Sequence, residues 1–194
     1  MNFKKTGSLI SKLRHEKGLT QKDIGDMLGI CAKTVSKWET GHGFPDVSLI
    51  GELSKIFQID ISKLLEGQLP ENKQEVGNVK KTKFYVCSEC GNVITSTGDA
   101  EIICCGRKVP FLEPKPFDEA HSLNIEKVED EYFITFSHPM EKSHYISFFS
   151  YVRFDRVLTV RLYPEQGGEL RLPVMRGGKL YYCCNEHGLF EIKI

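Results

Sequence analysis

The chain has 194 residues, enough for two or three compact domains. It is 40% hydrophobic and 27% charged, a composition that excludes a disordered chain and allows buried cores. Its formal net charge is zero, with 10 Lys and Arg against 8 Asp and Glu in residues 1–66 and 16 against 18 in the remainder, so charge alone does not predict a nucleic-acid partner. No stretch has the apolar core of a signal peptide or the length of a membrane span, which predicts a cytoplasmic protein without a membrane partner.

Residues 1–66 carry the apolar periodicity of short helices. Apolar side chains recur three and four positions apart along residues 8–66, which predicts an all-α domain of five helices around one core. Thr20 is placed to cap the second helix, and Gly29 to end it. Cys31 stands at the start of the third helix, where we expect a weak cap or a packed residue rather than a redox switch.

The third predicted helix has two different faces. Val35 and Trp38 share the face that packs, and the opposite face is small or cationic, as suits a helix in the major groove of DNA. Residues 18–65 resemble the phage-repressor-like helix-turn-helix family along nearly their whole length. The resemblance implies a double-stranded DNA operator as partner, with DNA contacts from Gln21, Lys22, Ala32, Lys33, Thr34, Ser36 and Lys37. A helical module that binds another protein is the alternative.

Residues 67–83 form the next segment, GQLPENKQEVGNVKKTK. The segment is polar, contains a proline and two glycines, and shows no sustained hydrophobic period. These features predict a flexible linker between the helical domain and the rest of the chain.

Four of the seven cysteines are close together in the sequence, at Cys87, Cys90, Cys104 and Cys105. In a reducing compartment such thiols are more often metal ligands than disulfides, and four thiolates form a tetrahedral shell that suits iron or zinc. Over residues 84–113 the motifs CxxCGN and CCG resemble the desulforedoxin module. The resemblance implies a small all-β unit that holds one iron ion, and zinc at the same sulfurs is the alternative.

Residues 114–194 alternate in polarity and are rich in Tyr, Phe, Val and Ile, with turn residues between the segments. The pattern predicts a small antiparallel β-sandwich. Five possible metal ligands fall on this frame, at His121, His138, His144, Cys184 and His187. A single histidine in such a domain is usually structural, so the prediction of a site depends on all five together.

Two motifs in the predicted sandwich, SHPMEKSHYI and CCNEHGLF, resemble the iron motifs of superoxide reductases. That family binds iron with four equatorial histidines and one axial cysteine. The resemblance assigns His138 and His144 to the first motif, Cys184 and His187 to the second, and His121 to the remaining histidine. It also implies an open sixth position on the iron, opposite a thiolate that pushes electron density toward the metal.

The segment before His121 departs from that family. Glu119 keeps a carboxylate that can occupy the sixth position, but Ala120 stands where the family has a lysine that attracts superoxide. Its loss should slow turnover, because positive charge at the entrance raises the encounter rate with an anion. Lys142 is a candidate replacement, with a solvated surface role as the alternative, and Cys183 is expected to be a packed thiol.

The combination supports two functional hypotheses. In the first, the protein is a DNA-binding transcriptional regulator, and its desulfoferrodoxin-like iron domain senses superoxide, another small oxidant or the redox state. In the second, the protein is a superoxide reductase that takes electrons from a rubredoxin-like donor and carries a DNA-binding domain. A homodimer is expected in the first case, because desulforedoxin-like modules often dimerise. The two helix-turn-helix domains of a dimer could then bind the two half-sites of an operator.

Overall fold

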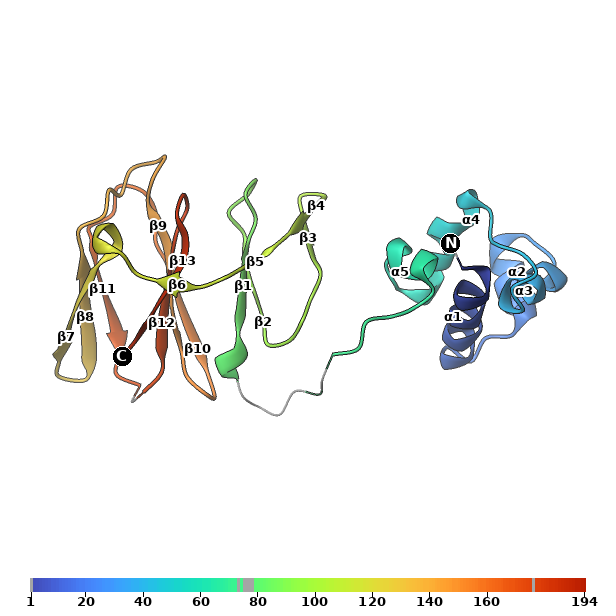
Figure 1. The fold of residues 1–194 in the computed structure, drawn as a ribbon, viewed down its shortest axis with the longest axis horizontal. Helices are drawn as coiled ribbons and strands as arrows, with labels where there is room; N and C mark the ends of the chain where they lie inside the picture. Colours follow the sequence, from blue (N-terminus) through green and yellow to red (C-terminus); the bar gives the residue numbers. More distant parts are fainter. Residues whose placement is uncertain (1, 73, 75–78, 176) are drawn as a thin grey trace. The chain divides into compact units, whose positions relative to one another are not determined.

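The computed structural model describes residues 2–72, 74, 79–175 and 177–194 (Figure 1). The chain divides into two compact units, Met1–Glu71 and Asn72–Ile194. The first unit is helical and the second is rich in β-strands, so the predicted multidomain fold class is confirmed. Among the described residues, no helix combines the length and the apolar character that crossing a membrane requires.

The helical unit contains the five predicted helices. The first begins earlier than the apolar pattern indicates, because the side chain of Asn2 caps it by accepting a hydrogen bond from the backbone N–H of Lys5 at 3.2 Å. Thr20 and Asp23 form a reciprocal capping box at the second helix, and Gly29 ends that helix in the left-handed conformation, as predicted. The bounds are α1 Phe3–Glu16, α2 Gln21–Leu28, α3 Ala32–Glu39, α4 Val47–Phe57 and α5 Ile61–Glu66.

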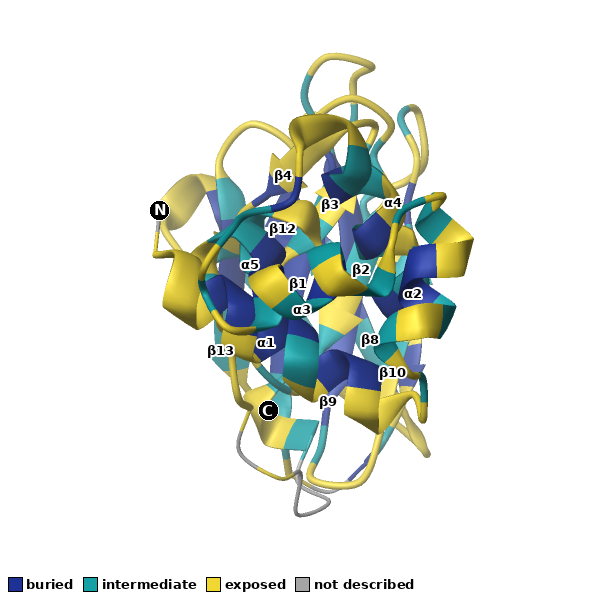
Figure 2. Ribbon diagram, turned by 90° about the vertical axis from the view of Figure 1, so that its right-hand side faces the viewer, coloured by how far each residue is buried: buried dark blue, intermediate teal, exposed yellow. Residues whose placement is uncertain are grey.

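The helices enclose a single apolar core, visible as the dark blue inner surfaces of this unit in Figure 2. Ile10, Ile24, Val35 and Leu53 are fully buried in it, and Trp38 is 4% exposed. These residues come from α1, α2, α3 and α4, so each of these helices contributes one face to the core. The packing holds α3 against α1 and α2, with its opposite face turned outward.

A glycine allows α1 and α3 to approach closely. A Cβ atom added at Gly7 would lie 2.1 Å from the carbonyl oxygen of Trp38, a backbone atom that has little room to move. At Gly51 in α4, by contrast, an added Cβ meets nothing within 4 Å. The two positions therefore form a matched pair for substitution.

We expect Gly7→Ala to destabilise the helical unit by about 1 to 3 kcal/mol, because the methyl group forces α1 away from α3. Gly51→Ala should stabilise it by about 0.5 to 1 kcal/mol, because alanine loses less backbone entropy in a helix. Trp38 is the only tryptophan of the chain, so its fluorescence during urea denaturation reports this unit alone. Equal effects of the two substitutions would disprove the close helix contact.

The second unit begins with short strands that carry the four clustered cysteines. The strands β2, β1 and β5 form one antiparallel sheet, and β3 and β4 form a hairpin. Their bounds are β1 Lys83–Val86, β2 Val93–Ser96, β3 Ile102–Cys104, β4 Arg107–Val109 and β5 Phe111–Leu112.

The remaining strands form two facing sheets, in the orders β10-β9-β12-β13-β6 and β11-β8-β7. The predicted sandwich is thus confirmed, with one difference: the short edge strand β6 runs parallel to β13. In β11, Leu170 and Leu172 alternate with polar neighbours, in agreement with the predicted pattern. The bounds are β6 Lys115–Pro116, η2 Glu119–His121, β7 Leu123–Val128, β8 Glu131–Phe136, β9 Ile146–Val152, β10 Val157–Arg161, β11 Glu169–Pro173, β12 Lys179–Cys184 and β13 Gly188–Lys193.

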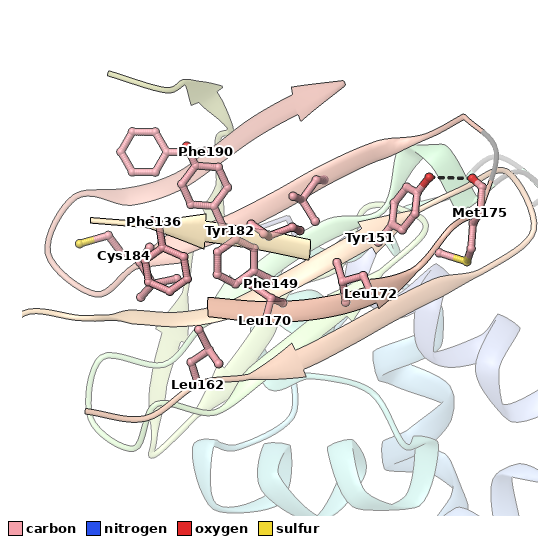
Figure 3. Packing of buried hydrophobic residues seen from close by; sticks show 13 residues of the cluster. Phe136, Phe149, Tyr151, Leu162, Leu170, Leu172, Met175, Tyr182, Cys184 and Phe190 are labelled. Carbon is pink, nitrogen blue, oxygen red and sulfur yellow. Dashed lines mark hydrogen bonds between the residues drawn. The ribbon is translucent and has the colours of Figure 1, made fainter. Parts of the chain in front are cut away.

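Strand β9, which lies between β10 and β12, is buried on both faces. Phe149 and Tyr151 point into the sandwich core, which Figure 3 shows with Cys184 at one end and the Tyr151–Met175 hydrogen bond at the other. Phe148 points the other way and stacks on Phe84 of β1, with ring centroids 5.6 Å apart. The cysteine-bearing sheet therefore covers the outer face of the five-stranded sheet as a third layer.

The predicted linker, residues 67–83, has structured ends. Leu69 packs against the helical core, and Asn72 exchanges hydrogen bonds with the backbone of Asp99. On the other side, Val79–Lys81 form the 3-10 helix η1, and β1 already begins at Lys83. The prediction of a flexible linker is too long at both ends, and residues 73 and 75–78 lie outside the described residues.

Candidate metal centres and DNA-reading face

The four clustered cysteines converge on one point. The sulfur atoms of Cys87, Cys90, Cys104 and Cys105 all lie within 4.8 Å of one another. The first pair sits in a tight turn after β1, closed by hydrogen bonds from Cys87 N–H to the Asn92 carbonyl at 3.0 Å and from Gly91 N–H to the Cys87 carbonyl at 2.9 Å. The second pair lies in the β3–β4 turn, where Cys105 has a φ of 50°.

Thiols of this cluster shift one another's pKa in opposite directions. Backbone N–H groups of Cys90 and Glu89 stabilise the thiolate of Cys87 and lower its pKa to about 7. Cys105 shows the opposite shift, because hydrogen bonds with Cys90 and Cys87 help to raise its pKa to about 12. Neighbouring sulfurs thus compete for protons, and a metal ion would replace those protons with four metal–sulfur bonds.

The second cluster forms at one end of the sandwich. Donor atoms of His121, His144, Cys184 and His187 all lie within 4.8 Å of one another. His144 Nε2 is 3.2 Å from His187 Nδ1, which is itself 3.4 Å from the sulfur of Cys184. The fifth predicted residue, His138, is outside that mutual group but borders it, with ring centroids 4.4 Å from His144 and 5.1 Å from His121.

Two of these histidines have a ring nitrogen that is ready to bind a metal. The Nδ1 atom of His121 lies 2.6 Å from Asp118 Oδ1, and Nδ1 of His138 lies 3.1 Å from the carbonyl oxygen of Pro139. Both acceptors require an N–H at Nδ1, which leaves a lone pair on Nε2. Both Nε2 atoms are buried and have no hydrogen-bond partner among the described residues. Such unpaired buried nitrogens fit a metal ion.

Burial affects the protonation of two of the predicted ligands in different ways. It lowers the pKa of His138 to about 4, helped by the nearby His144 and His121, so the imidazole is neutral. Burial also raises the pKa of the Cys184 thiol, while backbone N–H groups of His187 and Glu186 oppose that shift. A cation bound here would draw Cys184 toward the thiolate, giving four neutral nitrogens and one anionic sulfur.

Several residues that the sequence analysis did not single out hold this cluster in place. Asn185 joins its two loops, because its Oδ1 accepts from Tyr145 N–H and its Nδ2 donates to the Ser143 carbonyl, both at 2.7 Å. A register shift between Cys183 and Cys184 turns the Cys184 end of β12. Asn185 could have been found as the second residue of the CNEH motif. Asp118 has no such sequence signal.

Glu119 and Lys142, predicted near the open position, lie on the surface. Glu119 is exposed next to His121 and is not among the clustered donors. The amine of Lys142 lies 3.8 Å from Glu165, and its side chain is 83% exposed. This agrees with the alternative of a solvated role for Lys142. Cys183 is 3% exposed and packs beneath β1, as expected for a structural thiol.

The predicted DNA-reading residues lie at α2 and α3. Lys22, Lys33 and Lys37 are exposed, whereas Ala32, Thr34 and Ser36 are half-buried. Gln21 donates a hydrogen bond from Nε2 to Glu39 at 2.7 Å, so its amide has an intramolecular partner. Cys31 precedes α3 but is exposed and makes no capping hydrogen bond, which contradicts both expected roles.

Comparisons with known proteins match both units. The helix-turn-helix family model matches residues 10–64. The chain is 33% identical over 81 residues to the HTH-type transcriptional activator BcrR of Enterococcus faecalis, covering 40% of this chain and 39% of that protein. The superoxide reductase from Treponema pallidum has a similar fold, with a TM-score of 0.51, 18% identity, and coverage of 58% of this chain and 98% of that one.

A longer sequence match, over 121 residues, is with desulfoferrodoxin of Syntrophotalea carbinolica. It is 30% identical over 121 residues, which cover 58% of this chain. The match also spans 96% of that protein, so nearly all of the relative has a counterpart here. The chain therefore belongs to the desulfoferrodoxin family, and it carries in addition an N-terminal helix-turn-helix domain.

Proposed function

We propose that the protein is a DNA-binding transcriptional regulator whose desulfoferrodoxin-like domain holds iron and senses superoxide or the redox state. The observation that carries this proposal is a cluster of four nitrogen and sulfur donors, bordered by His138, in a chain that also has a helix-turn-helix domain. Regulation requires only that oxidation of the metal changes the free energy of the protein conformation that binds DNA.

The proposed ligands are Cys87, Cys90, Cys104 and Cys105 at one centre and His121, His138, His144, Cys184 and His187 at the other. Iron held by these four histidines and Cys184 would supply one-electron chemistry toward a small oxidant. The protein contributes a neutral imidazole at His138, the buried thiol of Cys184 and the backbone N–H of His187, which donates to that sulfur. At the four-cysteine centre, zinc would be a purely structural alternative.

On the DNA side, the exposed amines of Lys33 and Lys37 can reach phosphates or base edges. The proposed operator is double-stranded DNA with two half-sites about 34 Å apart, read by a homodimer. Oxidation at the iron would then change the geometry or stability of that dimer.

This function can be tested on the full chain, purified without oxygen and loaded with iron. Duplexes selected from a random DNA library by the reduced protein would serve as probes, and fluorescence anisotropy would compare the reduced and oxidised proteins. We expect a change in affinity of about 5- to 150-fold on oxidation. Cys184→Ala should abolish the change. Equal affinities in both states would refute sensing.

Lysine variants separate DNA contact from sensing. Lys33→Ala and Lys37→Ala should weaken binding in both oxidation states and reduce its salt dependence by about one unit of slope each. Lys12→Ala is the matched control, because Lys12 is also exposed but lies on α1, next to Glu16. Equal losses in all three variants would indicate nonspecific attraction instead of a reading face.

A superoxide reductase is the second candidate, favoured by the presence of all five donors. Ala120 and the pairing of Lys142 with Glu165 count against fast turnover, because they leave little positive charge to attract the anion. A superoxide pulse with a rubredoxin-like donor distinguishes the candidates. Repeated release of one hydrogen peroxide per superoxide, electron and two protons indicates an enzyme, whereas a single slow oxidation of the protein indicates a sensor.

A further inference from the structure

The carboxylate of Asp118 binds His121 at two points. Its Oδ1 is 2.6 Å from Nδ1 of the ring and accepts the backbone N–H of the same residue at 3.0 Å. The second contact makes Asp118 the N-cap of the short helix η2. The Asp118 side chain is 62% exposed, whereas that of His121 is 3% exposed, so the pair joins solvent to the buried donor cluster.

The backbone and the ring face of His121 also have contacts. Its backbone carbonyl accepts a hydrogen bond from the buried hydroxyl of Tyr182 at 2.6 Å. Phe190 stacks on its ring, with centroids 4.3 Å apart and planes inclined by 23°. With the backbone and ring face fixed, the carboxylate decides which ring nitrogen carries the proton. It selects Nδ1–H and leaves the buried Nε2 lone pair directed to the cluster.

We propose that Asp118 is a positioning residue that fixes the tautomer of His121 and sets how readily the bound iron is oxidised. This inference rests on the proposed iron centre. A negative charge on the far side of an imidazole makes the ring a stronger donor and stabilises the more positive oxidation state. Asp118 thereby sets the midpoint potential of the bound iron. That potential determines which oxidants can oxidise the iron, and so which oxidants a sensor detects.

The neighbouring histidine shows what Asp118 adds. Nδ1 of His138 donates to the carbonyl of Pro139 at 3.1 Å, a neutral acceptor at a longer distance. That contact can fix a tautomer but contributes no full charge. Of these two rings, only His121 has a carboxylate behind it.

Two substitutions separate the charge of Asp118 from its geometry. In Asp118→Asn the amide oxygen can still accept from Nδ1–H and cap η2, so only the negative charge is lost. Asp118→Ala removes both. The matched control is Asp130→Asn, which deletes one negative charge from the exposed β7–β8 turn, one strand length, or roughly 20 Å, from His121.

In the metal-depleted full chain, long-range proton–nitrogen NMR should show the Nδ1–H tautomer of His121 in the native protein and in Asp118→Asn, and a mixture in Asp118→Ala. In the iron-loaded chain, the midpoint potential should rise in Asp118→Asn and remain unchanged in Asp130→Asn. Iron transfer to a chelator should become easier by about 10- to 100-fold in Asp118→Ala.

Either of two results would overturn the inference. One is an Nε2–H tautomer of His121 in the native chain, and the other is the same midpoint potential in Asp118→Asn and Asp130→Asn. Failure of the proposed regulatory function would give a different result. The DNA affinity would then be the same in the reduced and oxidised proteins, while the midpoint potential would still shift in Asp118→Asn.

Discussion

Replacing Cys184 by alanine is expected to remove the metal from the histidine cluster while the four-cysteine centre stays loaded. Cys184 supplies the only thiol among the clustered donors at that site, and backbone N–H of His187 points at its sulfur from 3.4 Å. Without it the site loses its one anionic ligand, so metal retention should fall by more than the roughly 10- to 100-fold that loss of an outer hydrogen-bond partner costs. Elemental analysis should show the content falling from two metal ions per chain to one.

Cys183→Ala is the matched control for this prediction. Cys183 is the next residue along β12 and is equally buried, but it packs in the cluster beneath β1, away from the histidines. Its loss should leave both metals in place and cost only the stability of a small cavity. Optical spectra separate the two variants, because a thiolate-to-iron absorption band should disappear in Cys184→Ala alone. Loss of the same metal from both variants would mean that β12 is merely disturbed.

The second large effect concerns the ion pair between Arg14 and Glu39. Two hydrogen bonds join them, Nε to Oε1 at 2.6 Å and Nη2 to Oε2 at 3.0 Å, and their side chains are 10% and 6% exposed. Arg14 also donates to the Leu19 carbonyl at 2.8 Å, so one side chain links α1, the α1–α2 turn and α3. Glu39→Ala should destabilise the helical unit by about 3 kcal/mol, because it leaves a buried guanidinium unpaired.

Trp38 fluorescence during urea denaturation measures this loss. The control is Glu52→Ala, which breaks the exposed Glu52–Lys55 pair and should change stability by less than about 0.5 kcal/mol. The double variant Arg14→Met, Glu39→Leu should recover much of the loss, since removing both charges ends the desolvation cost. A double variant as unstable as Glu39→Ala would show that shape, not charge, makes the contact important.

Acid should weaken the same contact. Burial on its own would raise the pKa of Glu39, but hydrogen bonds from Arg14 and Gln21 outweigh it and hold the pKa below its ordinary value of 4.5. The folded state therefore binds the proton less readily than the unfolded state. Its stabilising contribution is complete above pH 4.5 and is lost as the pH falls through the lower, folded pKa.

Much of this architecture could be predicted because short motifs encode it. The motifs HPMEKSH and CCNEH are short, and they contain three of the four donors that lie close together, His144, Cys184 and His187; His121 was assigned by the resemblance. The caps at Thr20 and Gly29 are equally local, since each involves residues within one helical turn. Such features depend little on the rest of the fold.

The features that escaped prediction depend on long-range packing. Gln21 bonds to Glu39, eighteen positions away, which no local pattern indicates. The run HYISFFSYV has no clean polar alternation, because a third layer covers the outer face of β9. Asp118 is only three residues from His121, yet its role depends on Tyr182 and Phe190, which fix the ring in place.

The aromatic contact between Phe84 and the sandwich should couple metal loss at one candidate centre to metal loss at the other. Phe84 lies three residues before Cys87. Its ring stacks on Phe148 of β9 and lies tilted against Tyr181 of β12, the strand that ends at Cys184. Loss of an ion from the four-cysteine cluster would loosen β1, and a loosened β1 would admit water along β9 and β12. Chelation at the sulfur site should therefore make the second ion easier to lose, so that both leave in one cooperative step.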